Sequence, residues 1–203
     1  MSEGVSPSPV ETRRAALRER IVDAAAERVA EGGAEAIRAR DLAAAAGCAV
    51  GALYNAVGDR NAILAAVNRR TFAGMAADVA ARVEAAGPQP VDRMVAMALA
   101  YRDYARANPR RWEALFDQAL RLDAEIASGY REQLSTVVEL IESEVSRLRP
   151  DMNGSDRSVL ARLLYSSVHG TVALSLEGRY VAVPADHLDR MLTLLVQNVT
   201  SQM

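Results

Sequence analysis

The chain has no lysine, one cysteine, two histidines and few aromatic residues, which make up 4% of its 203 residues. With Cys48 as the sole cysteine, the chain cannot form an internal disulfide or a multi-cysteine metal site. Two histidines are too few for a histidine-rich metal site. We therefore expect neither a bound metal ion nor a cofactor.

Targeting segments are also missing. Residues 1–8 are mostly polar and contain one proline, without the apolar core of a signal peptide, and we expect them to form a disordered tail. No stretch is both long enough and free enough of charge to span a membrane. These absences predict a cytoplasmic protein.

Charge does not identify a nucleic-acid binder by itself. All 24 basic residues are arginine, and 26 acidic residues give a net charge of −2. Residues 1–74 carry 10 arginines against nine acidic residues, a net of +1, whereas residues 75–203 carry a net of −3. Any contact with DNA must therefore come from a local basic patch.

Alanine is abundant and hydrophobic residues make up half of the chain, a composition that favours helices. Apolar residues recur with helical spacing between Gly and Pro breaks, and no run has the length and neighbours of a sheet strand. The sequence predicts an all-α fold of about nine helices. The expected helices are a pair of short ones within residues 38–57 and longer ones over 9–32, 60–86, 91–107, 109–120, 124–148 and 184–202, and one that ends at Leu176 after a cap at Ser155 or Asp156. Ser8 and Glu11 are expected to form a capping box at the start of the first helix, and Asp59 is expected to cap the helix over 60–86.

A helix-turn-helix is the central motif. An Ala-rich helix ends at Gly47, where glycine allows the positive φ of a tight turn. The next helix places Leu53 and Val57 four residues apart on one face. Two short helices joined in this way have the size and connection of a unit whose second helix enters the major groove of DNA.

Several short motifs lie in and around this unit. They are Arg40-Asp41-Leu42-Ala43, Ala46-Gly47, Gly51-Ala52-Leu53-Tyr54 and Ile63-Leu64, preceded by Arg18-Glu19-Arg20-Ile21-Val22-Asp23-Ala24-Ala25. Together they resemble the TetR family of bacterial transcriptional regulators. The resemblance implies an N-terminal three-helix head that forms a DNA-binding domain over residues 9–70, with its helix-turn-helix at about 38–57, and a C-terminal helical body that forms a ligand-binding and dimerisation domain over residues 71–203. It further implies a repressor that a small, mainly apolar molecule releases from operator DNA.

The motif departs from the family pattern at several positions. Family members often have Ser or Thr near Arg38 and Ala49, where a hydroxyl caps a helix or meets a phosphate. Lys is frequent at the position of Val50, Thr at that of Ala52, and His or Tyr at that of Ala56. The departures keep a second function open, in which the chain is a TetR-like small-molecule binder or partner-dependent module with weak or no DNA binding.

The DNA-contacting candidates follow from side-chain chemistry. Val50 and Ala52 can touch thymine methyl groups, whereas the Asn55 amide can pair with adenine. Tyr54 either contacts DNA or packs against the first helix. We expect that helix to brace the motif, and its early arginines, Arg13, Arg14 and Arg18, are additional candidates for phosphate contact. The full candidate set is Arg38, Arg40, Val50, Gly51, Ala52, Tyr54, Asn55 and Arg60, in which the arginines would anchor phosphates and Arg40 could instead pair with a carboxylate.

Residues 91–183 hold most of the aromatic and methionine content, which is typical either of an ordinary core or of an apolar ligand pocket. Trp112 with the later His169-Gly170 resembles a subgroup of TetR C-terminal domains. His169 lies on a largely apolar helix, where it either bonds a carbonyl or Tyr or contacts ligand. The ligand-binding candidates are Met97, Tyr101, Tyr104, Trp112, Phe116, Tyr130, Tyr165 and His169.

The last two helices have wide apolar stripes that fit a homodimer through a four-helix bundle, their own protein core, or both. The stripes comprise Val159, Leu160, Leu163, Leu164, Val168, Val172 and Leu176 on one helix and Leu188, Met191, Leu192, Leu195 and Val199 on the other.

Ser166 and Ser167 lie near His169 but have no acid at a recognisable spacing, so we expect no enzyme activity.

Overall fold

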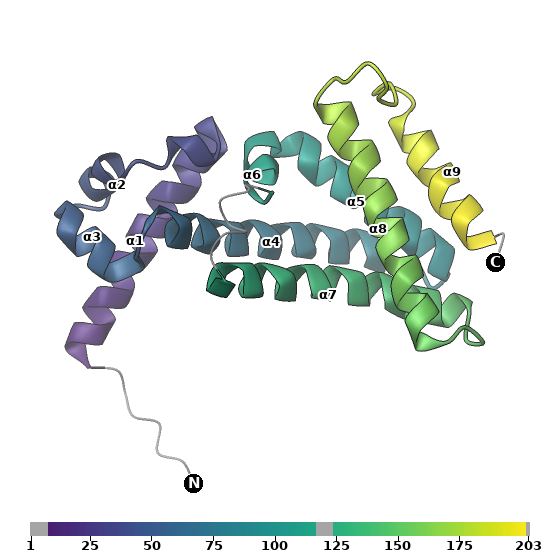
Figure 1. Cartoon of the computed structure of the whole chain (residues 1–203), viewed down its shortest axis with the longest axis horizontal. Helices are drawn as coiled ribbons and strands as arrows, with labels where there is room; N and C mark the ends of the chain where they lie inside the picture. The colour runs from purple at the N-terminus through teal and green to yellow at the C-terminus, as the bar shows by residue number, and fades with distance from the viewer. Residues whose placement is uncertain (1–7, 117–123, 202–203) are drawn as a thin grey trace, which may run out of the picture. The chain divides into compact units, whose positions relative to one another are not determined.

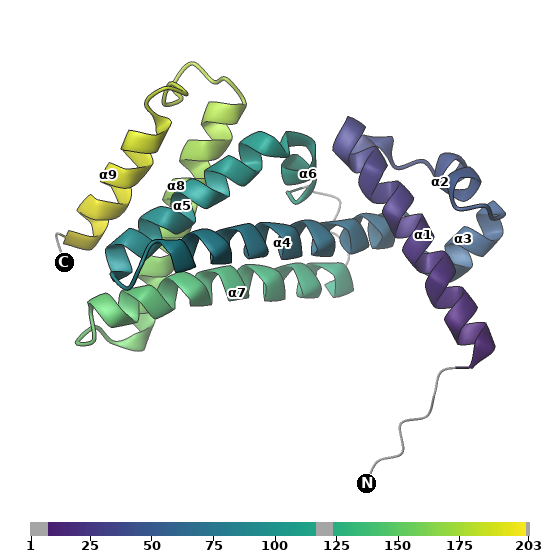
Figure 2. The same ribbon diagram turned by 180° about the vertical axis from the view of Figure 1, so that it is seen from behind.

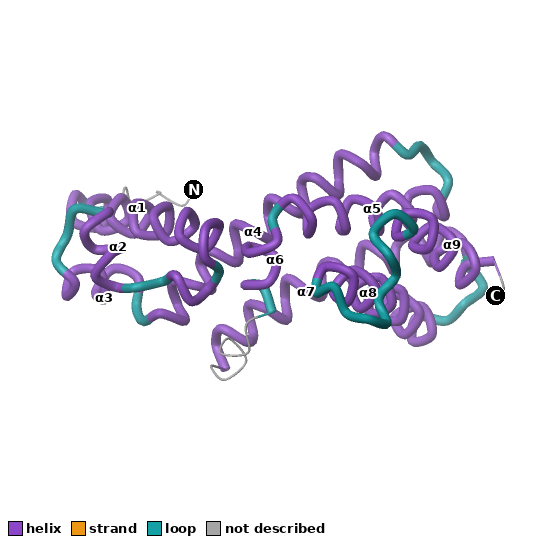
Figure 3. Tube along the Cα trace, turned by 90° about the horizontal axis from the view of Figure 1, so that it is seen from above, coloured by secondary structure: helices purple, strands orange, loops and turns teal. Residues whose placement is uncertain are grey.

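A computed structural model describes residues 8–116 and 124–201, with side chains of 124–131 and of residue 134 left out. The described residues form nine α-helices and one short 3₁₀ helix, η1, and they contain no strand (Figure 3). The all-α expectation is therefore confirmed. The elements are α1 (Pro9–Gly32), η1 (Ala34–Ala36), α2 (Ala39–Ala45), α3 (Val50–Val57), α4 (Arg60–Ala85), α5 (Pro90–Ala107), α6 (Pro109–Ala114), α7 (Ala124–Leu148), α8 (Gly154–Leu176) and α9 (Leu188–Ser201).

The chain divides into two compact units, and the division falls inside α4. The first unit runs to Thr71 and also takes the segment that begins at Arg110, so it contains α1 to α3, the first half of α4, and α6. The second unit begins at Phe72 and holds the rest of α4 with α5, α8, α9 and most of α7.

The first unit is built on α1, whose ends follow local sequence signals. The Ser8 hydroxyl accepts from the Glu11 amide at 3.3 Å, and the Glu11 carboxylate accepts from the Ser8 amide at 2.7 Å, a capping box. These bonds lower the pKa of Glu11. Gly33, with a φ of 71°, ends the helix. In Figure 1 α2 and α3 lie beside α1, and they share a core that includes the fully buried Ile21, Val29, Leu42, Leu53 and Leu64.

The second unit packs long helices side by side. The C-terminal half of α4 lies along α7 in the views of Figures 1 and 2, and α8 runs beside α9. Two buried charges join these helices. Glu144 on α7 accepts from Arg93 at 2.7 Å and from Arg147 at 2.5 Å. Arg102 on α5 makes a paired hydrogen bond with Asp189 at the start of α9.

Three expected boundaries were wrong. Helix α6 ends at Ala114 rather than at residue 120, although residues 117–120 lie outside the described part of the chain. The cap of α8 is Asn153, whose side chain accepts from the Asp156 amide at 2.9 Å, so α8 begins at Gly154. Residues 184–187 form a turn closed by the His187 amide and the Pro184 carbonyl, and α9 therefore begins at Leu188.

Helix α8 also corrects the expectation about apolar stretches. At 23 residues it is long and apolar enough to cross a membrane by length and composition alone, and it is the sole such helix in the part of the chain that is described. A core helix of a soluble protein passes the same test. Only 28% of its most apolar window is buried within the chain, which leaves an uncovered apolar face.

Candidate nucleic-acid interface and ligand site

Helix α3 separates a buried face from an exposed one. Leu53, Ala56 and Val57 are buried against the core of the first unit. Tyr54, whose exposed fraction is 47%, and Asn55 lie on the exposed side. Ala56 fills a core position, so a large polar side chain would not fit there without rearrangement. The exposed side of α3 is the candidate DNA-reading face.

Gly51 stands at the exposed beginning of that face. A Cβ built on Gly51 would meet no atom within 4 Å, so the glycine is not required by packing. The neighbouring Val50 and Ala52 are half-buried. The apolar contact surface that these two residues can offer to DNA is therefore small.

The amino ends of α2 and α3 have no side-chain cap. Arg38 and Ala49 occupy the N-cap positions with extended backbone, and neither side chain bonds a helix amide. Losing a Ser, Thr or Asp cap costs a helix about 1 kcal/mol. Both helices must therefore be stabilised by contacts other than N-caps, and their first amides are available to an acceptor such as phosphate oxygen.

The three predicted phosphate anchors differ in their surroundings. Arg38 and Arg40 are exposed, and neither forms an ion pair with a carboxylate in the described segments. Arg60 is half-buried instead, and it donates to the Ala34 carbonyl at 2.7 Å and to the Glu35 carboxylate at 3.2 Å. Arg60 thus ties α4 to η1 and has fewer donors left for a phosphate.

Arginines of α1 bind backbone carbonyls at the ends of the two short helices. Arg14 donates to the Asn55 carbonyl at 2.7 Å, and Arg18 donates to the Ala56 carbonyl at 3.4 Å. Arg20 similarly donates to the carbonyl of Ala46 at the end of α2, at 3.2 Å. Sequence patterns did not identify these contacts, because the partners lie 26 to 41 residues apart.

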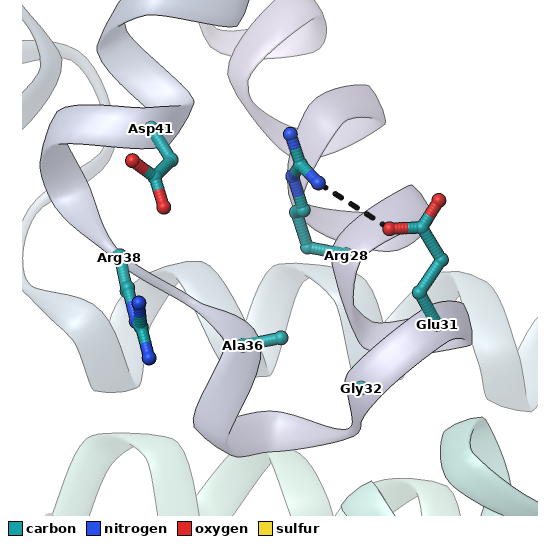
Figure 4. Close-up of a pocket in the computed structure, with 6 residues that line it drawn as sticks. All are labelled: Arg28, Glu31, Gly32, Ala36, Arg38 and Asp41. Carbon is teal, nitrogen blue, oxygen red and sulfur yellow. Dashed lines mark hydrogen bonds and ion pairs between the residues drawn. The ribbon is translucent and has the colours of Figure 1, made fainter.

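A shallow hollow of about 270 Å³ lies between the end of α1, η1 and the start of α2. Figure 4 shows its lining residues, including the ion pair of Arg28 with Glu31 at 3.3 Å. Arg38 and Asp41 line it as well, so the hollow has two positive and two negative groups. This balance of charge does not favour an anion over a cation.

Three of the predicted ligand-binding residues come together in the second unit. The Tyr101 hydroxyl on α5 lies 2.7 Å from Nδ1 of His169 on α8. The ring of Tyr165 stacks on His169 with an interplanar angle of 11° and centroids 5.8 Å apart. Burial lowers the pKa of His169, which favours the neutral imidazole near pH 7. The cluster therefore combines the polar atoms of a hydroxyl group and an imidazole with the apolar faces of aromatic rings.

The other ligand candidates have different surroundings. Met97 is buried in a small core cluster with Val83 and Ala96. Tyr104 is also buried. Trp112 and Phe116 belong to the first unit, where their rings meet edge to face at 5.1 Å. The side chain of Tyr130 lies outside the described residues.

Helices α8 and α9 have both buried and exposed apolar side chains. Leu160, Leu164, Val168 and Val172 are buried, as are Leu188 and Leu192 of α9. Other apolar residues of these helices are exposed: Val159 and Leu163 have exposed fractions of 63% and 50%, and Leu174 and Leu194 are exposed too. We name this exposed set, Val159, Leu163, Leu174 and Leu194, the α8–α9 apolar face.

Among the described residues no group of three His, Cys, Asp or Glu side chains is placed to hold a metal ion. His187 and Asp186 lie 3.7 Å apart in the exposed turn before α9.

Comparison with family models and with solved structures indicates the family of this chain. Residues 94–199 match the family model described as "Tetracyclin repressor-like, C-terminal domain". No curated protein sequence matches the chain. Among solved structures, the TetR family transcriptional regulator PfmR from Thermus thermophilus shares 17% identity with a TM-score of 0.61, covering 89% of this chain and 97% of its own.

Two further structures were solved with ligands. The transcriptional regulator FadR from Bacillus subtilis, in complex with stearoyl-CoA, shares 14% identity with a TM-score of 0.68, covering 91% of this chain and 98% of its own. AibR, in complex with isovaleryl coenzyme A and operator DNA, shares 17% identity with a TM-score of 0.63, covering 88% and 97%. At these identities the likeness concerns the fold alone.

Proposed function

The chain belongs to the TetR family of transcriptional regulators, and from this premise we propose that it is a cytoplasmic, ligand-responsive repressor without enzyme activity. The observation that carries the proposal is the exposed face of α3, where Tyr54 and Asn55 project from a helix whose other face is buried. A helix of this size, fixed on a small core, fits the major groove of B-DNA.

DNA recognition divides between phosphate anchoring and base contact. We assign phosphate anchoring to Arg38 and Arg40, because both are exposed and lie at the start of α2. Asn55 is the one amide on the reading face, and its natural partner is adenine. With apolar Val50 and Ala52 beside it, part of the specificity would come from thymine methyl groups and DNA shape.

The proposed active form is a homodimer. The α8–α9 apolar face is supporting evidence, since an apolar surface of this kind commonly marks a protein interface. Pairing α8 and α9 with the same helices of a second copy would cover it in a four-helix bundle. Two heads would then read half-sites about 34–36 Å apart on the duplex.

The proposed effector is a small, mainly apolar molecule that binds the second unit. Tyr101, Tyr165 and His169 supply aromatic walls and polar atoms that such a ligand could contact. Acyl-coenzyme A thioesters, in which an apolar acyl chain is joined to a large and charged coenzyme A, are tested as a separate class, because FadR and AibR, which share the fold, are described with stearoyl-CoA and isovaleryl coenzyme A. A ligand with higher affinity for the DNA-free form would shift the equilibrium towards release.

A second function is favoured by three positions of the first unit where side-chain groups that could bind DNA are missing or already bonded. Arg38 and Ala49 lack the hydroxyl that could meet a phosphate, and Arg60 donates to η1, so fewer side-chain groups are available to DNA. In this alternative the chain keeps the fold and binds a small molecule or a protein partner, with weak or no DNA binding.

Fluorescence anisotropy separates the two. The purified protein is titrated onto duplex DNA from upstream of its own gene and onto a scrambled duplex, each at two salt concentrations. Tight, salt-sensitive binding that prefers the upstream duplex supports the repressor, because phosphate contacts release counterions. Equal and weak binding to both supports the alternative. Release of the bound duplex by an added acyl-coenzyme A would identify the effector class.

A further inference from the structure

We propose that Arg14 and Arg18 of α1 are positioning residues for the recognition helix. They hold the C-terminal end of α3 on α1 and thereby fix the orientation of Asn55 and Tyr54 towards DNA. The inference rests on the proposed DNA-binding function, and it assigns these arginines to α3 rather than to the phosphate backbone.

Helix α3 needs such support because it is short and uncapped. It has eight residues, and isolated helices of that length are not stable in water. The side chain of Ala49 provides no N-cap acceptor. The position of α3 therefore depends on tertiary contacts, which are its buried apolar face and the bonds at its C-terminal end.

The bonds at that end satisfy carbonyls that the helix cannot pair itself. The last four carbonyls of a helix have no partner within it. In α3 the Tyr54 carbonyl accepts from the Gly58 amide at 2.9 Å, and the next two accept from Arg14 and Arg18. The guanidinium charges also lie at the negative end of the helix dipole, where a cation is favourable.

The spacing of the two arginines matches this role. Arg14 and Arg18 are four residues apart, so they occupy the same face of α1 and reach successive carbonyls of α3. Arg13 is equally exposed but makes no hydrogen bond to the described part of the chain. Arg20 binds the Ala46 carbonyl of α2 in the same manner, so α1 secures both helices of the motif.

We call the contacts of Arg14 and Arg18 with the end of α3 the clamp. Asn55 belongs both to this clamp and to the proposed recognition of DNA bases. Its backbone carbonyl accepts the 2.7 Å bond from Arg14, and its side chain is the amide proposed to pair with adenine. A bidentate pair with a base requires both the distance and the direction of the amide to be correct. Freeing the end of α3 should therefore weaken specific binding more than non-specific binding.

The test compares Arg14→Ala with Arg13→Ala, two exposed neighbours that remove the same charge. Affinities for the upstream duplex and for the scrambled duplex are measured at several salt concentrations. We expect Arg14→Ala to lower the preference for the upstream duplex about tenfold, the effect of losing one hydrogen bond from a charged donor. The slope of log affinity against log salt concentration should stay at the wild-type value, and Arg13→Ala should keep the preference.

Arg14→Lys adds a conservative variant, since an ammonium group retains one donor and should restore part of the preference. If Arg14→Ala instead leaves the preference unchanged and reduces the salt slope by about 1, Arg14 is a phosphate contact and the proposal is overturned. An unchanged preference with an unchanged slope overturns it as well.

A measurement without DNA separates this proposal from the proposed function. Amide hydrogen exchange at Gly58 reports opening of the end of α3, because that amide bonds the Tyr54 carbonyl. Arg14→Ala should accelerate this exchange about tenfold relative to Arg13→Ala. If the wild type binds no duplex, the repressor function fails while faster exchange still supports the clamp; an equal rate in both variants overturns the clamp.

Discussion

The Tyr101 hydroxyl and Nδ1 of His169 share a 2.7 Å hydrogen bond that joins α5 to α8. When the hydroxyl donates, the neutral imidazole has its remaining proton on Nε2. Tyr165, four residues before His169 on α8, stacks on the imidazole ring. The histidine is therefore held by two aromatic neighbours from two helices, in an environment that disfavours its charged form.

Acid should destabilise the protein partly through His169. Burial lowers its pKa below the usual 6.5, so between the folded pKa and about 6.5 the unfolded chain binds more protons. Stability contributed by the neutral histidine is therefore present above pH 6.5 and is lost as the pH falls. Urea unfolding at pH 7.5 and pH 5.5 should show a smaller loss for His169→Gln than for wild type. His187→Gln, at an exposed histidine, is the control and should lose as much as wild type.

Arg40→Ala should weaken binding to specific and scrambled duplexes by about the same factor. The side chain is exposed and has no ion-pair partner in the described residues, which suits a phosphate contact. The slope of log affinity against log salt concentration should fall by about 1. Arg106→Ala, an exposed arginine at the end of α5, removes the same charge and should leave both quantities unchanged. A change confined to the specific duplex would show that Arg40 contacts bases.

Leu163→Glu should dissociate the proposed homodimer. Leu163 belongs to the α8–α9 apolar face and is half-exposed, so a carboxylate there need not disturb the protein's own core. Within a dimer interface it would be an unpaired buried charge. Light scattering coupled to gel filtration should give the mass of one chain instead of two. Ser155→Glu, in the exposed first turn of α8, should retain the mass of the wild type; a dimeric Leu163→Glu variant would place the interface elsewhere.

Glu144→Ala should lower the free energy of unfolding by about 1.5–3 kcal/mol, the cost of losing a buried acceptor of hydrogen bonds from charged donors. The carboxylate is buried, and its loss leaves Arg93 and Arg147 without their shared acceptor. Arg93 also donates to the Val83 carbonyl, so the junction of α4 and α5 would lose its anchor on α7. Glu139→Ala, on the exposed side of α7, should cost under about 1 kcal/mol in the same denaturation experiment. Similar losses in both variants would contradict this role of Glu144.

Helix ends were predictable where the sequence has a local signal with a local partner. Ser8 and Glu11 form their capping box, Gly33 ends α1, and the Asp59 carboxylate accepts from the Ala62 amide at 2.8 Å at the start of α4. Pro184 was misleading because proline suits a turn as well as the first turn of a helix. Residue type alone could not distinguish the two structures.

Side-chain partners were less predictable than helices. Helical periodicity assigned Leu53 and Val57 to a buried face, and both are buried. It did not reveal that Arg14 binds a carbonyl 41 residues away, because such a contact depends on how two helices pack. Likewise, the aromatic and methionine content of residues 91–183 selected Tyr101 and Met97 together, although only Tyr101 lies in the histidine cluster while Met97 packs in a core.

The open space around Gly51 has an evolutionary consequence. A Cβ at this position would meet no atom within 4 Å, and replacing glycine within a helix favours the helical state by up to about 1 kcal/mol. New residues can therefore arise here without a folding penalty. Divergence of target sequence among descendants of this chain could proceed through single substitutions at Gly51, while the architecture that supports them stays the same.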